Sequence, residues 1–229
     1  MKVSIPSGRL IIGDPCYIKA EHIPLMAAGE AFDDDVYELQ VPTEARIEYE
    51  EADGRVMKVS LIFDDNEMPE SECIGELGVD TAQLFFADAE HFAKNWIDEE
   101  YQDIRIYRNK EDGRTLQYRK DFPHYGVPIA SEGGKTMNDL NATGEWEPVQ
   151  VEKGELKVSY NGLCHCHDHG VGKLDDHIAV TSTGWGDGAY ELHKHMTPDG
   201  RIARLSLNFG EMWEEDEEEW EEEGGDEEE

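Results

Sequence analysis

One stretch of the chain, residues 164–195, concentrates side chains that can bind a metal ion. It contains six of the nine histidines and two of the four cysteines in the 229-residue sequence. Thiolate and imidazole groups are the ligands that zinc prefers. The stretch therefore predicts a zinc site, and its candidate ligands are Cys164, His165, Cys166, His167, His169, His177, His193 and His195.

A strand, a loop and a second strand would bring these ligands together. If residues 184–188 form the loop of a hairpin, the two-residue period of a strand places His177 opposite His195. The same period puts His193 on that face of the sheet. Residues 164–169 would then lie over the face as a flap.

Such a centre would be typical of a metal-dependent hydrolase, with Glu191 or Asp187 orienting a water molecule. The spacing leaves an alternative open. Paired cysteines of structural zinc sites are usually separated by about two to four residues, whereas one residue separates Cys164 from Cys166. The alternative is a polar, solvated sheet face with a flexible histidine-rich loop.

No complete catalytic motif is present elsewhere in the sequence. Residues 133–136 resemble the end of a phosphate-binding loop, but the position of its first glycine is Ile129. Asp14, Asp88 and Asp187 stand beside turn signals, where an aspartate usually accepts hydrogen bonds from the backbone. We expect structural roles for these three residues and no enzymatic activity.

The second outstanding property of the sequence is its negative charge. It has 54 acidic and 20 basic residues, a net charge of -34. Residues 214–229 carry 13 of the acids, and taking these away leaves 41 acidic residues against 20 basic ones. Such a charge repels phosphates and anionic lipids and favours cations or basic proteins. The alternative is that the charge serves solubility alone.

The elements that must position these residues are mostly strands. Runs rich in β-branched and aromatic residues, bounded by turn signals, predict strands. These runs are residues 9–12, 36–41, 45–49, 55–63, 74–86, 156–160, 178–183, 189–196 and 202–209. A helix is expected from its N-cap Asp88 to about Ile97. The prediction is an α+β fold, mainly antiparallel sheet with few helices.

The last four runs predict an antiparallel meander. In residues 100–150, Ile104, Ile106 and Tyr118 suggest strands, whereas the prolines, glycines and Asn-Asp of residues 123–139 suggest a long irregular connection. We expect a single α+β domain over residues 1–212. A disordered acidic tail should follow over residues 213–229, because it cannot bury enough apolar surface to become ordered.

A short internal echo links two distant segments. Residues 7–15 and 81–89 match in character at nearly every position, and each reaches an aspartate after three apolar residues. Two such strands could lie side by side in one sheet; a coincidental match is the alternative.

Three segments carry a resemblance to a known family. They are SGRLIIGDPCY at residues 7–17, GVDTAQLFFAD at residues 78–88, and residues 183–209, which begin TGWGDGAYEL and end PDGRIARLSLNF. With them the chain resembles the bacterial and phage domain-of-unknown-function family 4241 and related phage proteins of unknown function. The resemblance leaves about residues 90–155 uncovered and implies no activity.

These observations predict an acidic accessory protein of a phage or a bacterium. Its function would be non-catalytic binding or inhibition of a basic protein partner, as a nucleic-acid mimic that does not itself bind nucleic acid. The alternative is a metal-binding protein or hydrolase with zinc at residues 164–195. The apolar run at residues 10–12 is too short for a signal peptide or a membrane span, so we expect no membrane association. The expected location is the cytoplasm, of the host if the chain is phage-encoded.

Overall fold

The computed structural model describes residues 1–30, 35–99, 101, 105–150, 155–167 and 170–210. Its strands are β1 (Lys2–Ser4), β2 (Arg9–Gly13), β3 (Val36–Gln40), β4 (Glu44–Ala52), β5 (Arg55–Ile62), β6 (Ser71–Val79), β7 (Gln83–Asp88), β8 (Arg105–Asn109), β9 (Thr115–Gln117), β10 (Trp146–Gln150), β11 (Val171–Asp175), β12 (Ile178–Ser182), β13 (Gly188–Met196) and β14 (Ile202–Asn208). Its helices are η1 (Pro15–Tyr17), α1 (His22–Ala28), α2 (Ala89–Asn95), η2 (Ala130–Glu132), α3 (Met137–Ala142) and α4 (Tyr160–His165). The predicted tail, residues 213–229, lies outside the described residues.

The named strands pair in antiparallel fashion and form three sheets. The outer sheet has the order β1-β4-β5-β14-β13-β6, and the inner sheet has the order β11-β12-β7-β2-β3. A small third sheet has the order β10-β8-β9. The predicted α+β fold, mainly antiparallel sheet with few helices, is confirmed.

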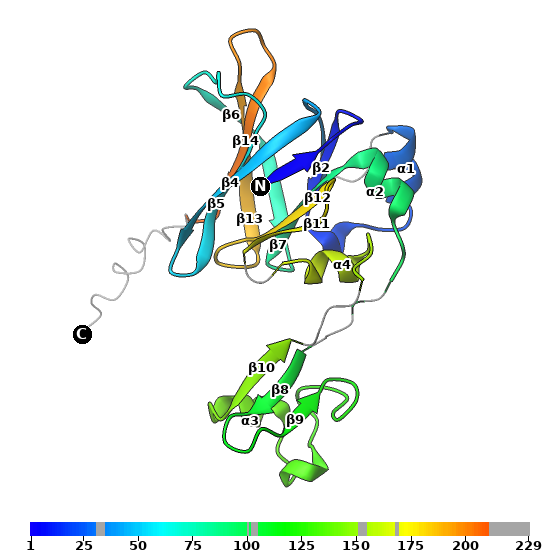
Figure 1. The fold of residues 1–229 in the computed structure, drawn as a ribbon, viewed down its shortest axis with the longest axis vertical. Coiled ribbons are helices and arrows are strands. Elements are labelled where there is room, and N and C mark those ends of the chain that lie inside the picture. The colour runs from blue at the N-terminus through cyan, green and yellow to red at the C-terminus, as the bar shows by residue number, and fades with distance from the viewer. Residues whose placement is uncertain (31–34, 100, 102–104, 151–154, 168–169, 211–229) are drawn as a thin grey trace, which may run out of the picture.

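The outer sheet, the inner sheet and the helices α1, α2 and α4 form three layers (Figure 1). Between the two sheets lies a core that includes Leu61, Leu205 and Phe86. On the other face of the inner sheet, Phe85 stacks on Phe92 of α2 with ring centroids 5.2 Å apart. β7 is thus buried on both faces, which explains its nearly continuous apolar sequence.

Strands β2 and β7 lie side by side at the centre of the inner sheet, as the echo between their sequences predicted. Each strand leads to an aspartate that binds the start of the other segment. The carboxyl group of Asp14 accepts hydrogen bonds from the N–H and hydroxyl of Thr81, at 2.8 and 2.6 Å. Asp88 accepts the equivalent bonds from Ser7, at 2.9 and 2.6 Å. The two segments are therefore related by an approximate two-fold axis.

The outer sheet follows the same two-fold arrangement. At its centre β5 pairs with β14, and Ser60 is opposite Ser206. Glu48 of β4 is opposite Ser60 on one side, and His193 of β13 is opposite Ser206 on the other. We call β1–β5 the first half of the fold, and β6, β7 and β12–β14 the second half. The strands of the two halves occupy equivalent positions in the two sheets.

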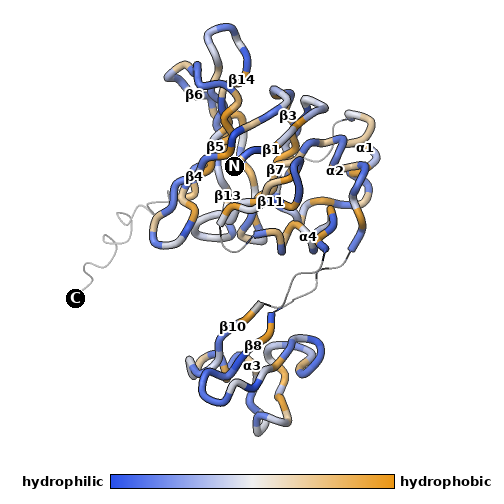
Figure 2. The backbone as a smooth tube through the Cα atoms, in the orientation of Figure 1, coloured by the Kyte–Doolittle hydropathy of each residue, from blue (hydrophilic) through white to orange (hydrophobic). Residues whose placement is uncertain are grey.

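The second half carries an insertion between α2 and α4. Residues 105–150, the inserted unit, build the third sheet and α3 around a core that includes Tyr107, Phe122 and Trp146. Figure 1 shows this unit apart from the other two sheets, and Figure 2 shows apolar segments on its strands. The single-domain organisation of residues 1–212 stays a prediction.

Three expectations about local structure are wrong at least in part. The strand suggested at Ile106 is present as β8 (Ile104 lies outside the described residues), but residues 123–139 are not irregular throughout, because a capping box between Thr136 and Asp139 begins α3. Residues 74–86 belong to two strands, β6 and β7. Residues 156–160 form no strand and lead into α4.

The predicted meander is also wrong at one connection. β12 pairs with β7 and β11 in the inner sheet, whereas β13 pairs with β6 and β14 in the outer sheet. The chain between them crosses from one sheet to the other instead of turning a hairpin. It passes so close to β5 that a Cβ on Gly184 would lie 2.8 Å from the carbonyl oxygen of Val56. The crossing separates His177 from His193 and His195.

The helices are short. α2 begins where the sequence predicts, because Asp88 accepts a hydrogen bond from the N–H of His91 at 2.8 Å. α1 has no side-chain cap and was not expected from the sequence. Within the described part of the chain, no helix has the length and apolar character needed to cross a membrane.

Candidate functional site

The candidate zinc ligands lie at three separate places in the described part of the chain. Cys164, His165, Cys166 and His167 are at the end of α4, His177 is beside α2, and His193 and His195 are on β13. His169 lies outside the described residues. The single centre that the hairpin register predicted does not form among these residues, because that register does not occur.

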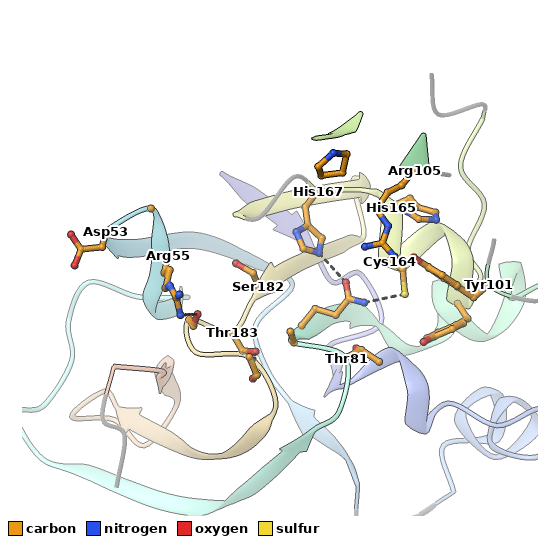
Figure 3. A pocket seen from close by; sticks show the side chains of 17 residues that line it. Asp53, Arg55, Thr81, Tyr101, Arg105, Cys164, His165, His167, Ser182 and Thr183 are labelled. Atoms are coloured by element: carbon orange, nitrogen blue, oxygen red, sulfur yellow. Dashed lines mark hydrogen bonds between the residues drawn. The ribbon is translucent and has the colours of Figure 1, made fainter. Parts of the chain in front are cut away.

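At the first place, Cys164 and His167 are joined through Gln83. The Nε2 group of Gln83 donates a hydrogen bond to Cys164 Sγ over 3.0 Å. The Oε1 atom of Gln83 is 2.9 Å from Nε2 of His167. Gln83 is buried at the start of β7, so the strand holds its amide between the thiol and the imidazole (Figure 3). One hydrogen-bond partner of the thiol is therefore an amide.

These groups line a cavity of about 870 Å³. Its wall includes Tyr160 of α4 and Gly184 from the crossing between the sheets. Arg55, at the start of β5, also lines it (Figure 3). Arg105 and Pro148 of the inserted unit line it as well. A cavity of this size can hold a small molecule, and its imidazole, hydroxyl and guanidinium groups suit a polar one.

Burial makes the Cys164 thiol a poor nucleophile. Loss of solvent raises the pKa of Cys164 to about 11, although hydrogen bonds with Gln83 and Tyr160 lower it by a smaller amount. The thiolate is the reactive form of cysteine. At pH 7 the cavity therefore presents a neutral thiol, which can take part in binding but is not activated for attack.

Two other candidate ligands make ring contacts that belong to the fold. His165 is buried and packs on Tyr101 with ring centroids 5.2 Å apart. His177 lies 4.3 Å from the ring of His91, whose Nε2 is 2.7 Å from the carboxylate of Asp175. Neither contact brings a thiolate beside these imidazoles.

The third place is different, because it gathers metal-binding donors. Cys73, Glu191 and His193 each offer a ligand atom, and these atoms all lie within 4.8 Å of one another. No other such group occurs among the residues that the structure describes. His195 is the next histidine on β13, and its pKa is lowered by burial and by the neighbouring His193.

The three aspartates at turn signals bind backbone groups, as expected. Besides its bonds to Thr81, Asp14 accepts a hydrogen bond from the N–H of Asp80 at 2.8 Å. Asp187 accepts one from the N–H of Ala82 at 3.0 Å. Ala82 has a φ of 56°, a left-handed conformation that such a contact stabilises. These carboxyl groups hold the loop before β7 in place.

Ten lysines and arginines of the described chain form ion pairs with carboxylates of the same fold. The ion pairs are Lys2–Glu44, Arg9–Glu38, Arg46–Asp65, Lys58–Glu50, Arg108–Glu147, Arg114–Glu132, Lys173–Asp176, Lys194–Glu72, Arg201–Asp64 and Arg204–Glu67. Because 54 acids face 20 bases in the sequence, this pairing leaves carboxylates in excess. The resulting field attracts basic groups and repels phosphates.

The solvent face of the outer sheet carries part of this excess. The helices lie on the far side of the inner sheet, so none of the described ones covers this face (Figure 1). At its centre are two small residues, Ser60 and Ser206. Its exposed acids are Glu44, Glu48, Glu50, Glu76 and Glu191. Arg46, Lys58 and Arg204 lie on the same face, so the surface carries carboxylates on both flanks together with basic side chains.

Sequence reasoning missed two residues of these places. Gln83 is a polar residue at the start of a strand buried on both faces, which is a signal that a sequence can give. Cys73 lies opposite His193 only because β6 contains a bulge. The only sign of that bulge in the sequence is Gly75.

No protein-family model matches the chain, and no curated protein and no solved structure matches it. The resemblance to family 4241 therefore stays a prediction, and the function has to be argued from the residues themselves.

Proposed function

We propose that the chain is a non-catalytic binding protein that acts on a basic protein partner. The observation that carries the proposal is the ion pairing of the basic side chains, which leaves an excess of carboxylates on the described surface. We place it in the cytoplasm as an accessory or inhibitor protein of a phage or a bacterium.

The solvent face of the outer sheet is the surface we assign to the partner. β4 presents Glu44, Glu48 and Glu50 on it, at alternate or more distant positions of one strand. Arg46 stands between Glu44 and Glu48 on the same face, and Lys2, Arg46 and Lys58 pair with the three carboxylates. Exposed ion pairs of this kind are weak, so basic groups of a partner can replace them, and a carboxylate-rich face fits a basic cleft that otherwise holds nucleic acid. Such a mimic associates fast at low salt and slowly at high salt.

The alternative, a hydrolase with one zinc centre over residues 164–195, has less support. Its candidate ligands are distributed over three places in the described chain, and Cys164 is a neutral thiol. A zinc centre with that ligand set would require the crossing between the sheets to be rebuilt.

The test is capture from a nuclease-treated bacterial lysate on the immobilised full-length chain, at about 50 mM and about 200 mM salt. We expect basic proteins whose own ligand is nucleic acid, recovered at low salt, lost at high salt and displaced by duplex DNA. A chain ending after Gly210, checked by circular dichroism, should still capture them.

Three results would contradict the proposal. The first is no capture at either salt concentration. The second is tight binding of DNA by the chain itself. The third is capture by the full chain only, because the acidic tail rather than the folded part would then be the binding element.

A further inference from the structure

We propose that Cys73, Glu191 and His193 form a binding site for a zinc-class divalent ion on the solvent face of the outer sheet. The three ligand atoms lie within 4.8 Å of one another. This site is distinct from the cavity beside Cys164, and it lies on the same sheet face as the acids of β4 but on β6 and β13. It uses one of the eight ligands that the sequence predicts.

β13 supplies two of the ligands. Glu191 and His193 are two residues apart, so both side chains point to the same face of the strand. The Nε2 atom of His193 is already 2.9 Å from Oε2 of Glu191. Zinc bonds to nitrogen and oxygen are about 2.0–2.2 Å long, so an ion between the two atoms requires only a small opening of this contact.

A β-bulge supplies the third ligand. Leu192 pairs with Gly75, but the next residue, His193, pairs with Cys73, so Ile74 is the extra residue of β6. Without the bulge, His193 would be opposite Ile74, and Cys73 would point to the other face. The bulge thus turns the thiol of Cys73 toward the imidazole. Bulges of this kind re-aim side chains at functional positions.

The inner sheet holds this bulge in place. Tyr37 of β3 reaches β6, and its hydroxyl oxygen accepts a hydrogen bond from the N–H of Glu76 at 3.1 Å. A Cβ on Gly75 would lie 1.7 Å from that oxygen, so the position requires glycine. The close approach of Tyr37 and the position of Cys73 are therefore parts of one local structure.

The donor set selects the ion. A thiolate, an imidazole and a carboxylate suit zinc and its relatives, whereas calcium and magnesium prefer oxygen ligands alone. Three protein ligands leave the fourth tetrahedral position to water. Glu191 is also directly opposite Glu76, and two like charges in this arrangement repel one another. A bound cation relieves that repulsion.

Cobalt(II) is the probe that tests the site, because a cobalt–thiolate bond gives a charge-transfer absorption in the near ultraviolet. The full-length chain is purified without a histidine tag, reduced with a non-chelating phosphine and titrated with cobalt. We expect the absorption to saturate at one equivalent and to be displaced by zinc. Oxygen ligands elsewhere on the acidic surface give no such band.

Three variants assign the band to its ligands. Cys73→Ser should lose it, and His193→Ala should weaken cobalt binding more than about tenfold, since even indirect partners of a metal contribute that much. Cys16→Ser, which removes another exposed thiol, is the matched control and should keep the band. Circular dichroism confirms that each variant is folded.

Three outcomes would overturn the proposal: no band with the unmodified chain, a band unchanged in Cys73→Ser, or a band lost in Cys166→Ser. The last would assign the metal to the segment at the end of α4.

Discussion

The two halves of the fold place different residues at one equivalent position of the outer sheet. In the first half, Glu48 is opposite Ser60 and lies 2.8 Å from Arg46, two residues earlier on β4. In the second half, His193 is opposite Ser206 and lies 2.9 Å from Glu191, two residues earlier on β13. Each half thus has a same-face pair at this point.

The neighbouring strands explain why only one of these pairs is suited to an ion. β1 pairs with β4 only over Glu44, Ala45 and Arg46, so it stops short of Glu48. β6 is nine residues long and passes His193, where its bulge adds Cys73. In the first half, Arg46 and Glu48 form a salt bridge, and the described residues gather no group of three metal ligands beside it. In the second half, Glu191 and His193 face a third ligand, Cys73.

The reciprocal aspartates give the strongest test of the two-fold arrangement. Asp14→Ala and Asp88→Ala should each lower the free energy of unfolding by about 3–5 kcal/mol, because several buried donors lose their acceptor. Urea unfolding measures this, and Asp80→Ala, on the exposed side of the same loop, should have a small effect. If Asp14→Ala left stability unchanged, the carboxyl group would not serve the fold.

Gly75→Ala tests whether the bulge in β6, which the first half lacks beside Glu48, positions Cys73. The new Cβ would overlap the hydroxyl of Tyr37, and the strain should cost about 2–3 kcal/mol. The variant should also lose the cobalt–thiolate band, because the bulge that aims Cys73 is disturbed. Gly78→Ala, on the same strand, has room for its Cβ and is the control. If the Gly75→Ala chain is stable and keeps the band, the bulge is not what positions Cys73 for metal binding.

Cys164 of α4 predicts a pH dependence of stability that its own substitution isolates. Its folded pKa, about 11, is raised above the unfolded value of about 8.5, so its stabilising contribution is complete below about pH 8.5. That contribution is lost as the pH rises toward 11. The stability difference between the natural chain and Cys164→Ala should therefore shrink by about 2 kcal/mol between pH 7.5 and 10.5. A difference that stayed constant with pH would show that burial does not shift this thiol.

Glu48→Gln should have the smallest effect. The carboxylate pairs with Arg46 at the surface, where ion pairs contribute little to stability. Differential scanning calorimetry should show a change of less than about 2 °C in the midpoint of unfolding. A larger change would mean that the first half depends on this pair more than its exposure indicates.

The sequence predicts the strands better than their sheets. Alternation and turn signals locate β2, β3, β5, β13 and β14 to within a residue or two. They do not reveal that the chain between Ser182 and Gly188 changes sheets, because a crossing and a hairpin loop have similar composition. Because of that one connection, His177 and His193 lie beside different sheets instead of on one sheet face.

The candidate sites were predicted only in part, for the same reason. Residue types identified His193 as a candidate metal ligand, but Cys73, the candidate ligand beside it, lies about 120 residues earlier in the chain. Cys73 and His193 meet only because β6 pairs with β13 and contains a bulge. Neither feature produces a periodic pattern of residues in the sequence. The aspartates at turns were easier to interpret, because their partners follow from local geometry.

The most direct test of the proposed function asks whether binding depends on a face or only on net charge. One variant carries Glu44→Gln, Glu48→Gln and Glu50→Gln on β4. The control carries Glu21→Gln, Glu30→Gln and Glu90→Gln on the helical side and has the same net charge. Capture of basic proteins at about 50 mM salt is compared for both. We predict that the β4 variant loses most of the captured protein while the control keeps it. Equal losses would contradict the assignment of the partner to the outer sheet.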